Sequence, residues 1–137
     1  ERPEGAAEAV RTFGQLYARI GAADRTALWL TGDLGGEDGS HWQSLTAILR
    51  HPVSGTVAVN LRGEYYADPD QVILATGTAN GFEGFGASAG LDYLIAPGVQ
   101  WRTEGRWLSA GDDVFANSDG GFESGAGFLV TALTFRW

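Results

Sequence analysis

The sequence contains no cysteine and no methionine, so it can form neither a disulfide framework nor a thiolate metal site. Lysine is absent as well, and all nine basic residues are arginine. Charged residues make up only 19% of the chain, below the usual share of about 25%. With a net charge of -8, the chain lacks the basic character that nucleic-acid binding requires. No apolar run reaches the ~18 residues of a transmembrane helix, which excludes a helical membrane protein.

A start methionine and a signal peptide are also missing, and we expect a mature form or a fragment. The chain does contain 21 glycines and 12% aromatic residues, within segments that alternate apolar and polar side chains. A period of two predicts β-strands. We expect an all-β, antiparallel, up-and-down arrangement of seven strands, at 11–21, 26–35, 41–51, 56–67, 84–96, 99–110 and 125–137. Residues 1–10 carry no such stripe and are interpreted as a leader or loop.

The connections between these segments differ in length and charge. Those at 22–25, 51–55 and 96–98 are short, the one at 36–40 is longer, and those at 67–83 and 111–124 are much longer. Short turns at one end and long loops at the other are typical of outer-membrane barrels, although a soluble meander can show the same asymmetry. The longer loops contain no arginine, and their carboxylates are Glu37, Asp38, Asp68, Asp70, Glu83, Asp112, Asp113, Asp119 and Glu123.

Segment 99–110 separates two kinds of side chain. Trp101 and Trp107 fall on one face, whereas the charged residues between them fall on the other. Charges inside a dry barrel are costly unless they are paired, but a wet lumen with the tryptophans outside in lipid avoids that cost. Segments 56–67 and 84–96 divide in the same way, whereas the register of segments 26–35 and 41–51 stays open. The predicted pore-lining residues are Arg62, Glu64, Asp92, Arg102, Glu104 and Arg106.

Aromatic residues on the opposite face are spaced for a membrane. Trp101 and Trp107 are six residues apart, which is roughly 15 Å along the membrane normal for a strand tilted by ~40°. Aromatic belts mark the two interfaces of a bilayer. The predicted girdle residues are Tyr65, Phe85, Tyr93, Trp101, Trp107, Phe135 and Trp137. Ordinary packing in a sheet core is the alternative interpretation of these aromatics.

Three stretches carry a resemblance to a known family: LRGEYYADPD (61–70), GLDYLIAPGVQWRTEGRWLSAGDDVF (90–115) and FLVTALTFRW (128–137). The chain resembles outer-membrane β-barrel porins of the porin-2 type, in their C-terminal part, from about residue 11 onwards. Members show an Arg-x-Glu-Tyr strand that leads into an Asp-Pro-Asp-Gly loop. Arg62, Glu64 and Tyr65 match this pattern, but Gln71 replaces the glycine. The aromatic end at Trp137 also fits outer-membrane proteins, and the resemblance implies a transmembrane barrel.

Seven strands do not close a barrel of this type. Bacterial single-chain barrels have even strand numbers and both termini on the periplasmic side, whereas the first segment here starts at the long-loop end. An open edge in lipid leaves backbone groups unsatisfied at several kcal/mol each. We therefore expect a C-terminal fragment of a larger barrel, or partner strands from other chains.

No catalytic residue, cofactor or metal site is expected. The run GFGASAG (84–90) has the wrong spacing for a dinucleotide-binding loop. Asp38, Ser40 and His41 are sequence neighbours without an oxyanion-hole signature, and the two histidines make no metal motif. The acidic loops offer oxygen ligands of the kind calcium favours. They are interpreted either as solvated carboxylates or as bridges to lipopolysaccharide through divalent cations.

The leading hypothesis assigns residues 11–137 to a β-barrel in the bacterial outer membrane of a Gram-negative envelope. In this hypothesis the barrel is a porin-like passive channel for small solutes or ions, and not an enzyme. The first alternative is a structural or anchoring barrel in an envelope complex, without transport. The second is a soluble β-barrel or sandwich that binds a small ligand. Expected partners are membrane lipid, the remaining barrel strands or other envelope subunits, and no nucleic acid. Charged lumen residues brace the wall through cross-strand pairs, set a weak ion selectivity, or do both.

Overall fold

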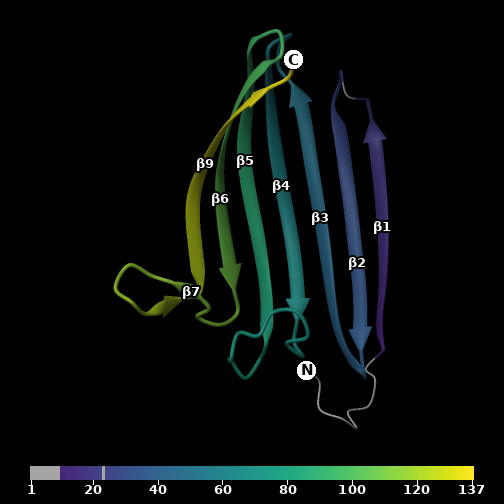
Figure 1. Ribbon diagram of the computed structural model, residues 1–137, viewed down its shortest axis with the longest axis vertical. Helices are drawn as coiled ribbons and strands as arrows, with labels where there is room; N and C mark the ends of the chain where they lie inside the picture. Colours follow the sequence, from purple (N-terminus) through teal and green to yellow (C-terminus); the bar gives the residue numbers. More distant parts are fainter. Residues whose placement is uncertain (1–9, 23) are drawn as a thin grey trace.

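The computed structural model describes residues 10–22 and 24–137, and these residues form strands, turns and loops without a helix. Seven long strands make one antiparallel sheet in which each strand pairs with its neighbours along the chain (Figure 1). Their bounds are β1 (Arg11–Gly21), β2 (Ala27–Glu37), β3 (Ser40–Pro52), β4 (Val57–Asp68), β5 (Phe82–Ala96), β6 (Val99–Ala110) and β9 (Gly125–Phe135). The expected all-β, seven-stranded antiparallel architecture is therefore confirmed.

Two short strands were not predicted. β7 (Phe115–Ala116) and β8 (Phe122–Glu123) pair with each other inside the loop between β6 and β9. Strands of two residues are too short to show a period in the sequence. The interpretation of residues 1–10 as a leader or loop falls outside the described residues, apart from Val10.

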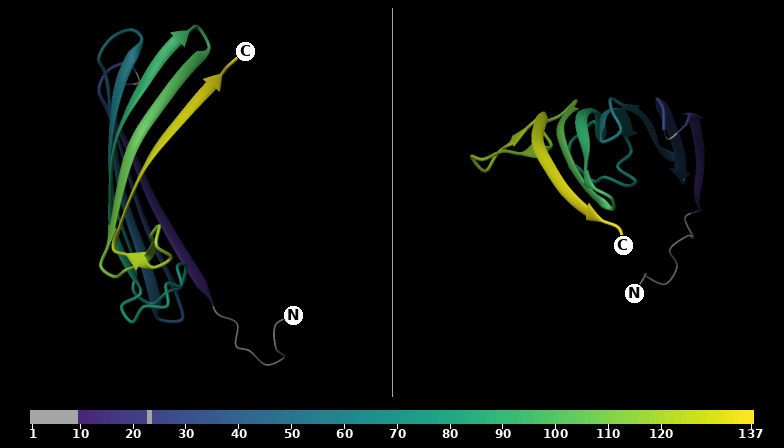
Figure 2. Two further views of the ribbon diagram at one scale, coloured as in Figure 1. Left: turned by 90° about the vertical axis from the view of Figure 1, so that its left-hand side faces the viewer. Right: turned by 90° about the horizontal axis from the view of Figure 1, so that it is seen from above.

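The sheet is a single curved layer that does not close. Seen from above, the strands follow an arc whose open side lies between β9 and β1 (Figure 2). Within residues 10–22 and 24–137, these two strands each pair on one side alone. No helix in this part of the chain is long and apolar enough to cross a membrane. Because no second layer covers the sheet, few apolar side chains are buried, and these are Ala27, Trp42, Ala58 and Ala67.

The turns are short at one end of the sheet, and the two longest loops lie at the other (Figure 1). The expectation of a longer connection at 36–40 is wrong. β2 and β3 continue to Glu37 and from Ser40, and a two-residue turn joins them. Asp38 and Gly39 have φ values of 51° and 86°, as a type I′ hairpin turn requires, and Asp-Gly is a favoured sequence for that turn. The long connections at 69–81 and 111–124 agree with the prediction.

The strand register settles the faces that the sequence left open. Residues directly opposite in an antiparallel pair share a face, and Trp29 of β2 lies opposite Ile48 of β3, which lies opposite Arg62 of β4. Extending this alternation across all seven strands gives two faces. The polar face carries Arg62 and its row partners. The apolar face carries Leu28, Leu30, Leu34, Leu45, Leu49, Val59, Leu61, Leu91, Leu129 and Leu133.

Charge is nearly absent from the apolar face. Glu83, at the long-loop end of β5, is its one carboxylate within the described strands, and no arginine lies there. Many of its large side chains are exposed, among them Leu129 at 77%. A continuous exposed apolar surface of this kind marks contact with a membrane or another protein. The face is therefore built to be covered by an apolar partner.

Candidate functional site

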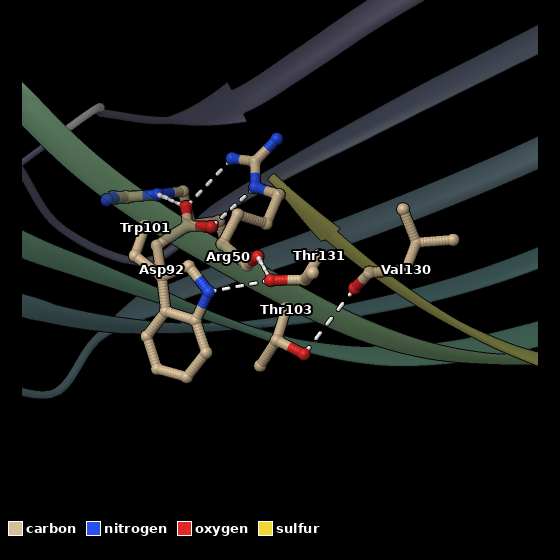
Figure 3. A network of polar contacts seen from close by, with 7 residues as sticks. Arg50, Asp92, Trp101, Thr103, Val130 and Thr131 are labelled. Atoms are coloured by element: carbon tan, nitrogen blue, oxygen red, sulfur yellow. Dashed lines mark hydrogen bonds and ion pairs between the residues drawn. The ribbon is translucent and has the colours of Figure 1, made fainter. Parts of the chain in front are cut away.

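The first cluster on the polar face is centred on Asp92 of β5. The register places Asp92 opposite Arg102 of β6, which donates two hydrogen bonds to the carboxylate, from Nε to Oδ1 at 2.5 Å and from Nη2 to Oδ2 at 2.9 Å. Arg50 of β3 reaches over β4, and its Nε lies 3.7 Å from Oδ2 (Figure 3). Such bidentate, charge-assisted pairs are the strong class of protein hydrogen bonds. Asp92 thus ties three strands of the sheet together.

The second cluster is centred on Glu64 of β4. Arg62 on the same strand pairs with it, with Nη2 2.6 Å from Oε2, and Arg106 of β6 pairs with it across β5. The residue of β5 opposite Glu64 is Gly86, and a Cβ at this position would overlap the Glu64 side chain. A glycine here lets the carboxylate lie flat over β5 and reach the next strand but one.

The two members of these pairs differ in exposure. The side chains of Asp92 and Glu64 are only 5% and 16% exposed, whereas those of Arg102 and Arg62 are 53% and 35% exposed. Carboxylates therefore lie against the wall, and guanidinium groups lie above them. The surface that this face presents is more cationic than its residue list indicates.

An open hollow of about 500 Å³ lies over this face, and we name it the polar-face hollow. It draws residues from β1 to β6, which agrees with the polar face being the concave one. Its lining is Tyr17, Trp29, Thr31, Ile48, Arg50, Asn60, Leu61, Arg62, Ser88, Gly90, Arg102 and Glu104. Three arginines thus share one hollow with two aromatic side chains.

All six residues predicted to line a pore lie on the polar face, and five of them, all but Glu104, form the ion pairs just described. Their role in a pore stays a prediction. Sequence reasoning missed Arg50 and Trp29, because the register of their strands was open. The signal that reveals them is the pairing to β4, which no local period contains.

The predicted girdle residues lie on the apolar face in two rows. Tyr65 of β4 is opposite Phe85 of β5, with ring centroids 4.9 Å apart, near the long-loop end, and Trp107 of β6 lies close to this level. Tyr93 is opposite Trp101 toward the short-turn end. The two remaining predicted girdle residues lie at the C-terminal end of the chain. Phe135 is the last residue of β9, and Trp137 follows it by two residues. Their role at a membrane interface stays a prediction.

Two girdle residues also have polar partners, and Tyr65 donates from its hydroxyl to Glu83 at 3.0 Å. Trp101 donates from Nε1 to the hydroxyl of Thr131 at 2.7 Å (Figure 3). Thr131 in turn donates to the backbone carbonyl of Arg102 at 3.2 Å. The indole N–H, which would be unsatisfied in an apolar medium, is thereby paired within the sheet.

The loop at 69–81 is built around one buried carboxylate. Asp68, the last residue of β4, lies beyond the Tyr65 row and is fully buried. Its Oδ1 accepts the N–H of Val72 at 2.8 Å, and its Oδ2 accepts those of Ile73 and Leu74 at 2.7 Å each. Burial raises the pKa of this carboxyl, but the three N–H donors and the nearby His41 lower it more, so that the net pKa lies below the ordinary 3.8.

Gln71 in this loop has a φ of 54°, in the left-handed region that glycine adopts without strain. This backbone conformation is a physical reason for the glycine that porins of the resembled type carry at this point. The Gln71 side chain offsets the strain, because its Oε1 accepts the N–H of Thr76 and of Gly77 at 2.9 Å each. The loop is thus ordered by two side chains, Asp68 and Gln71.

Acidification is expected to open this loop. A carboxyl with a lowered pKa stabilises the fold above its unfolded-state pKa, and the stability is lost as the pH falls through the lowered value. The protection factors of the Val72, Ile73 and Leu74 amides in hydrogen exchange should therefore stay constant above about pH 4 and fall below it. Asp68→Asn is the control, and its protection should be weaker and independent of pH. The same pH profile in both proteins would contradict this assignment.

Within the residues that the structure describes, no group of three or more histidine, aspartate or glutamate side chains is arranged to hold a metal ion. A single antiparallel sheet with one nearly uncharged apolar face and one ion-paired polar face is the wall of a β-barrel of the porin class. The chain belongs to the family described as "Putative beta-barrel porin-2, OmpL-like", whose model matches residues 4–136. This membership confirms the resemblance found in the sequence, and porin families are typically not enzymes. Searches of curated proteins and of solved structures gave no significant match.

Proposed function

We propose that the chain forms part of the wall of a barrel in the bacterial outer membrane, through which small solutes or ions pass passively. The observation that carries the proposal is the difference in charge between the two faces of one uncovered sheet. Arginine on a lipid-facing strand costs about 2–4 kcal/mol at the bilayer midplane, and the apolar face has none. The polar face concentrates its arginines in a hollow, as the wall of a water-filled pore would.

The open edges support a larger assembly. Backbone groups left unpaired in lipid cost several kcal/mol each, so β1 and β9 need partner strands in a membrane. These two strands run in the same direction (Figure 1), because an odd number of strands separates the ends of the meander. Direct pairing of β9 with β1 would therefore be parallel. An odd number of additional strands keeps every pair antiparallel, as in bacterial barrels with an even strand total.

Planar-bilayer recording of the intact assembly, in which the chain is purified in detergent with the strands that close its barrel and is then reconstituted, tests the proposal. We expect discrete conductance steps in symmetric potassium chloride, and a need for detergent or lipid to keep the protein monodisperse. Flat traces from material with the circular dichroism of a β-sheet would contradict a pore. A monodisperse protein in plain buffer would contradict the membrane location itself and would favour a soluble ligand-binding sheet.

One observation favours the second candidate, a structural or anchoring barrel without transport. Asp92 and Glu64 each contact two arginines, which is the arrangement that bracing of a wall requires. Bracing and conduction are compatible, and the bilayer recording separates a braced pore from a barrel that is closed to ions.

A further inference from the structure

We infer that the polar-face hollow binds small organic monoanions, in which a carboxylate is attached to an aromatic or aliphatic body. The inference rests on the proposed function to the extent that the polar face must be open to solutes. It goes beyond that function because it names the chemistry of the solute.

The anionic end of the solute is recognised by the arginines. Arg50, Arg62 and Arg102 line the hollow together, and a guanidinium has five N–H donors. Arg102 uses Nε and Nη2 on Asp92, yet its side chain is about half exposed, so further donors are within reach of a solute. Because the paired carboxylates lie buried below, a carboxylate entering the hollow meets donors before it meets acceptors. Arginine pairs with carboxylates bidentately, which favours this group over a spherical ion.

The body of the solute is recognised by the opposite side of the same hollow. Trp29 of β2, Tyr17 of β1 and Ile48 of β3 line it on that side. The Arg19 guanidinium lies over a Trp29 ring, 5.5 Å from the ring centroid, and this cation–π contact orients the ring at the side of the hollow. A volume of about 500 Å³ lies within the range of roughly 300–1,000 Å³ for small-molecule sites. Polar donors on one side and apolar rings on the other fit an amphipathic solute.

The charges that line the hollow limit the solute to one negative charge. Glu104 is the carboxylate among the lining residues, and it disfavours a second negative charge on the solute. Cations are disfavoured inside the hollow by the three arginines, although the acidic loops attract them to the long-loop end. A monoanion with an apolar body is the class that meets all of these conditions.

Isothermal titration calorimetry on the full chain in detergent micelles tests the inference, with benzoate as the probe. Titrations into protein-free micelles correct for partition into detergent. We expect a Kd for benzoate of about 1 mM or tighter, and at least tenfold weaker binding of benzyl alcohol and of benzylammonium. These two compounds keep the ring and remove or reverse the charge. Equal affinity for benzylammonium would overturn the inference.

The double variant Arg50→Gln/Arg62→Gln removes two of the three guanidiniums and leaves each of the two carboxylates with an arginine partner. Asp92 keeps its two hydrogen bonds from Arg102, and Glu64 keeps Arg106. We expect its Kd for benzoate to rise at least tenfold. The matched control Arg11→Gln/Arg136→Gln makes the same change in net charge outside the hollow, and its Kd should stay within twofold. Undiminished benzoate binding by the first double variant would also overturn the inference.

Trp29→Leu tests the apolar side separately. Leucine keeps an apolar side chain and removes the ring, so benzoate should bind about threefold more weakly. Acetate has a carboxylate but no ring, so its affinity, which is weaker than that of benzoate, should stay unchanged. Bilayer recording then separates the two hypotheses. Benzoate binding with flat traces would leave this inference in place and remove the pore, whereas conductance without benzoate binding would remove this inference alone.

Discussion

Leu129→Arg is expected to lower the free energy of unfolding by about 2–4 kcal/mol in phospholipid vesicles, because it places a charge at mid-depth in lipid. Leu129 lies on the apolar face opposite Gly105, between the levels of Trp101 and Trp107. An arginine here would have to reach an interface or draw water into the bilayer. Urea unfolding followed by tryptophan fluorescence gives the free energy.

The adjacent residue provides a matched control. Val130 lies on the polar face and is opposite Glu104, so Val130→Arg introduces the same side chain beside a carboxylate. We expect a change within about 1 kcal/mol for this variant. Equal losses of unfolding free energy for the two variants would mean that both faces contact the same medium, either lipid or water. Tolerance of both would indicate that the sheet is soluble, because an exposed leucine in water is replaced at little cost.

Asp92→Ala is expected to lower the free energy of unfolding by about 2–3 kcal/mol. Removing one partner of a buried ion pair costs about 3–5 kcal/mol when the other charge stays buried. The loss should be smaller here because the half-exposed Arg102 recovers part of its solvation. The variant also frees β3 and β6 from a shared anchor on β5. The same urea titration in vesicles measures the effect.

Two further variants serve as controls for Asp92→Ala. Asp119→Ala removes a carboxylate from the long-loop end, where its side chain is exposed, and should change stability by less than about 0.5 kcal/mol. Asp92→Asn keeps an acceptor for Arg102 but loses the charge, so its loss should lie between the other two. An Asp92→Ala protein as stable as the parent would show that the cluster does not brace the wall.

The boundaries of the long strands could be predicted from the sequence because alternation is a local property. β1 and β6 have the predicted bounds, and β5 begins two residues before its predicted start. The division of β6 into tryptophans on one face and charges on the other follows from the same period. The turn at Asp38 and Gly39 was misjudged although Asp-Gly is a sequence signal for a two-residue turn, because Gly35 and Gly36 interrupt the alternation of β2 just before it.

Partners within the site could not be predicted in the same way. The sequence places Glu64 and Arg106 on one face, but their contact over β5 depends on the register and on the missing side chain of Gly86. Likewise, Arg50 and Trp29 enter the hollow only through the pairing of β2 and β3 with β4. A slip of one residue in that pairing would move both side chains to the apolar face.

The sequence by itself determined that this protein is a meander of amphipathic strands with an acidic long-loop end and a nearly uncharged face. These properties depend on the order of neighbouring residues, and a strand has them whichever strand it pairs with. Tertiary structure alone decided which charges meet, which carboxylates are buried and where the hollow forms. Those properties depend on contacts between residues up to 42 positions apart, and such contacts exist only once the register of every intervening strand is set.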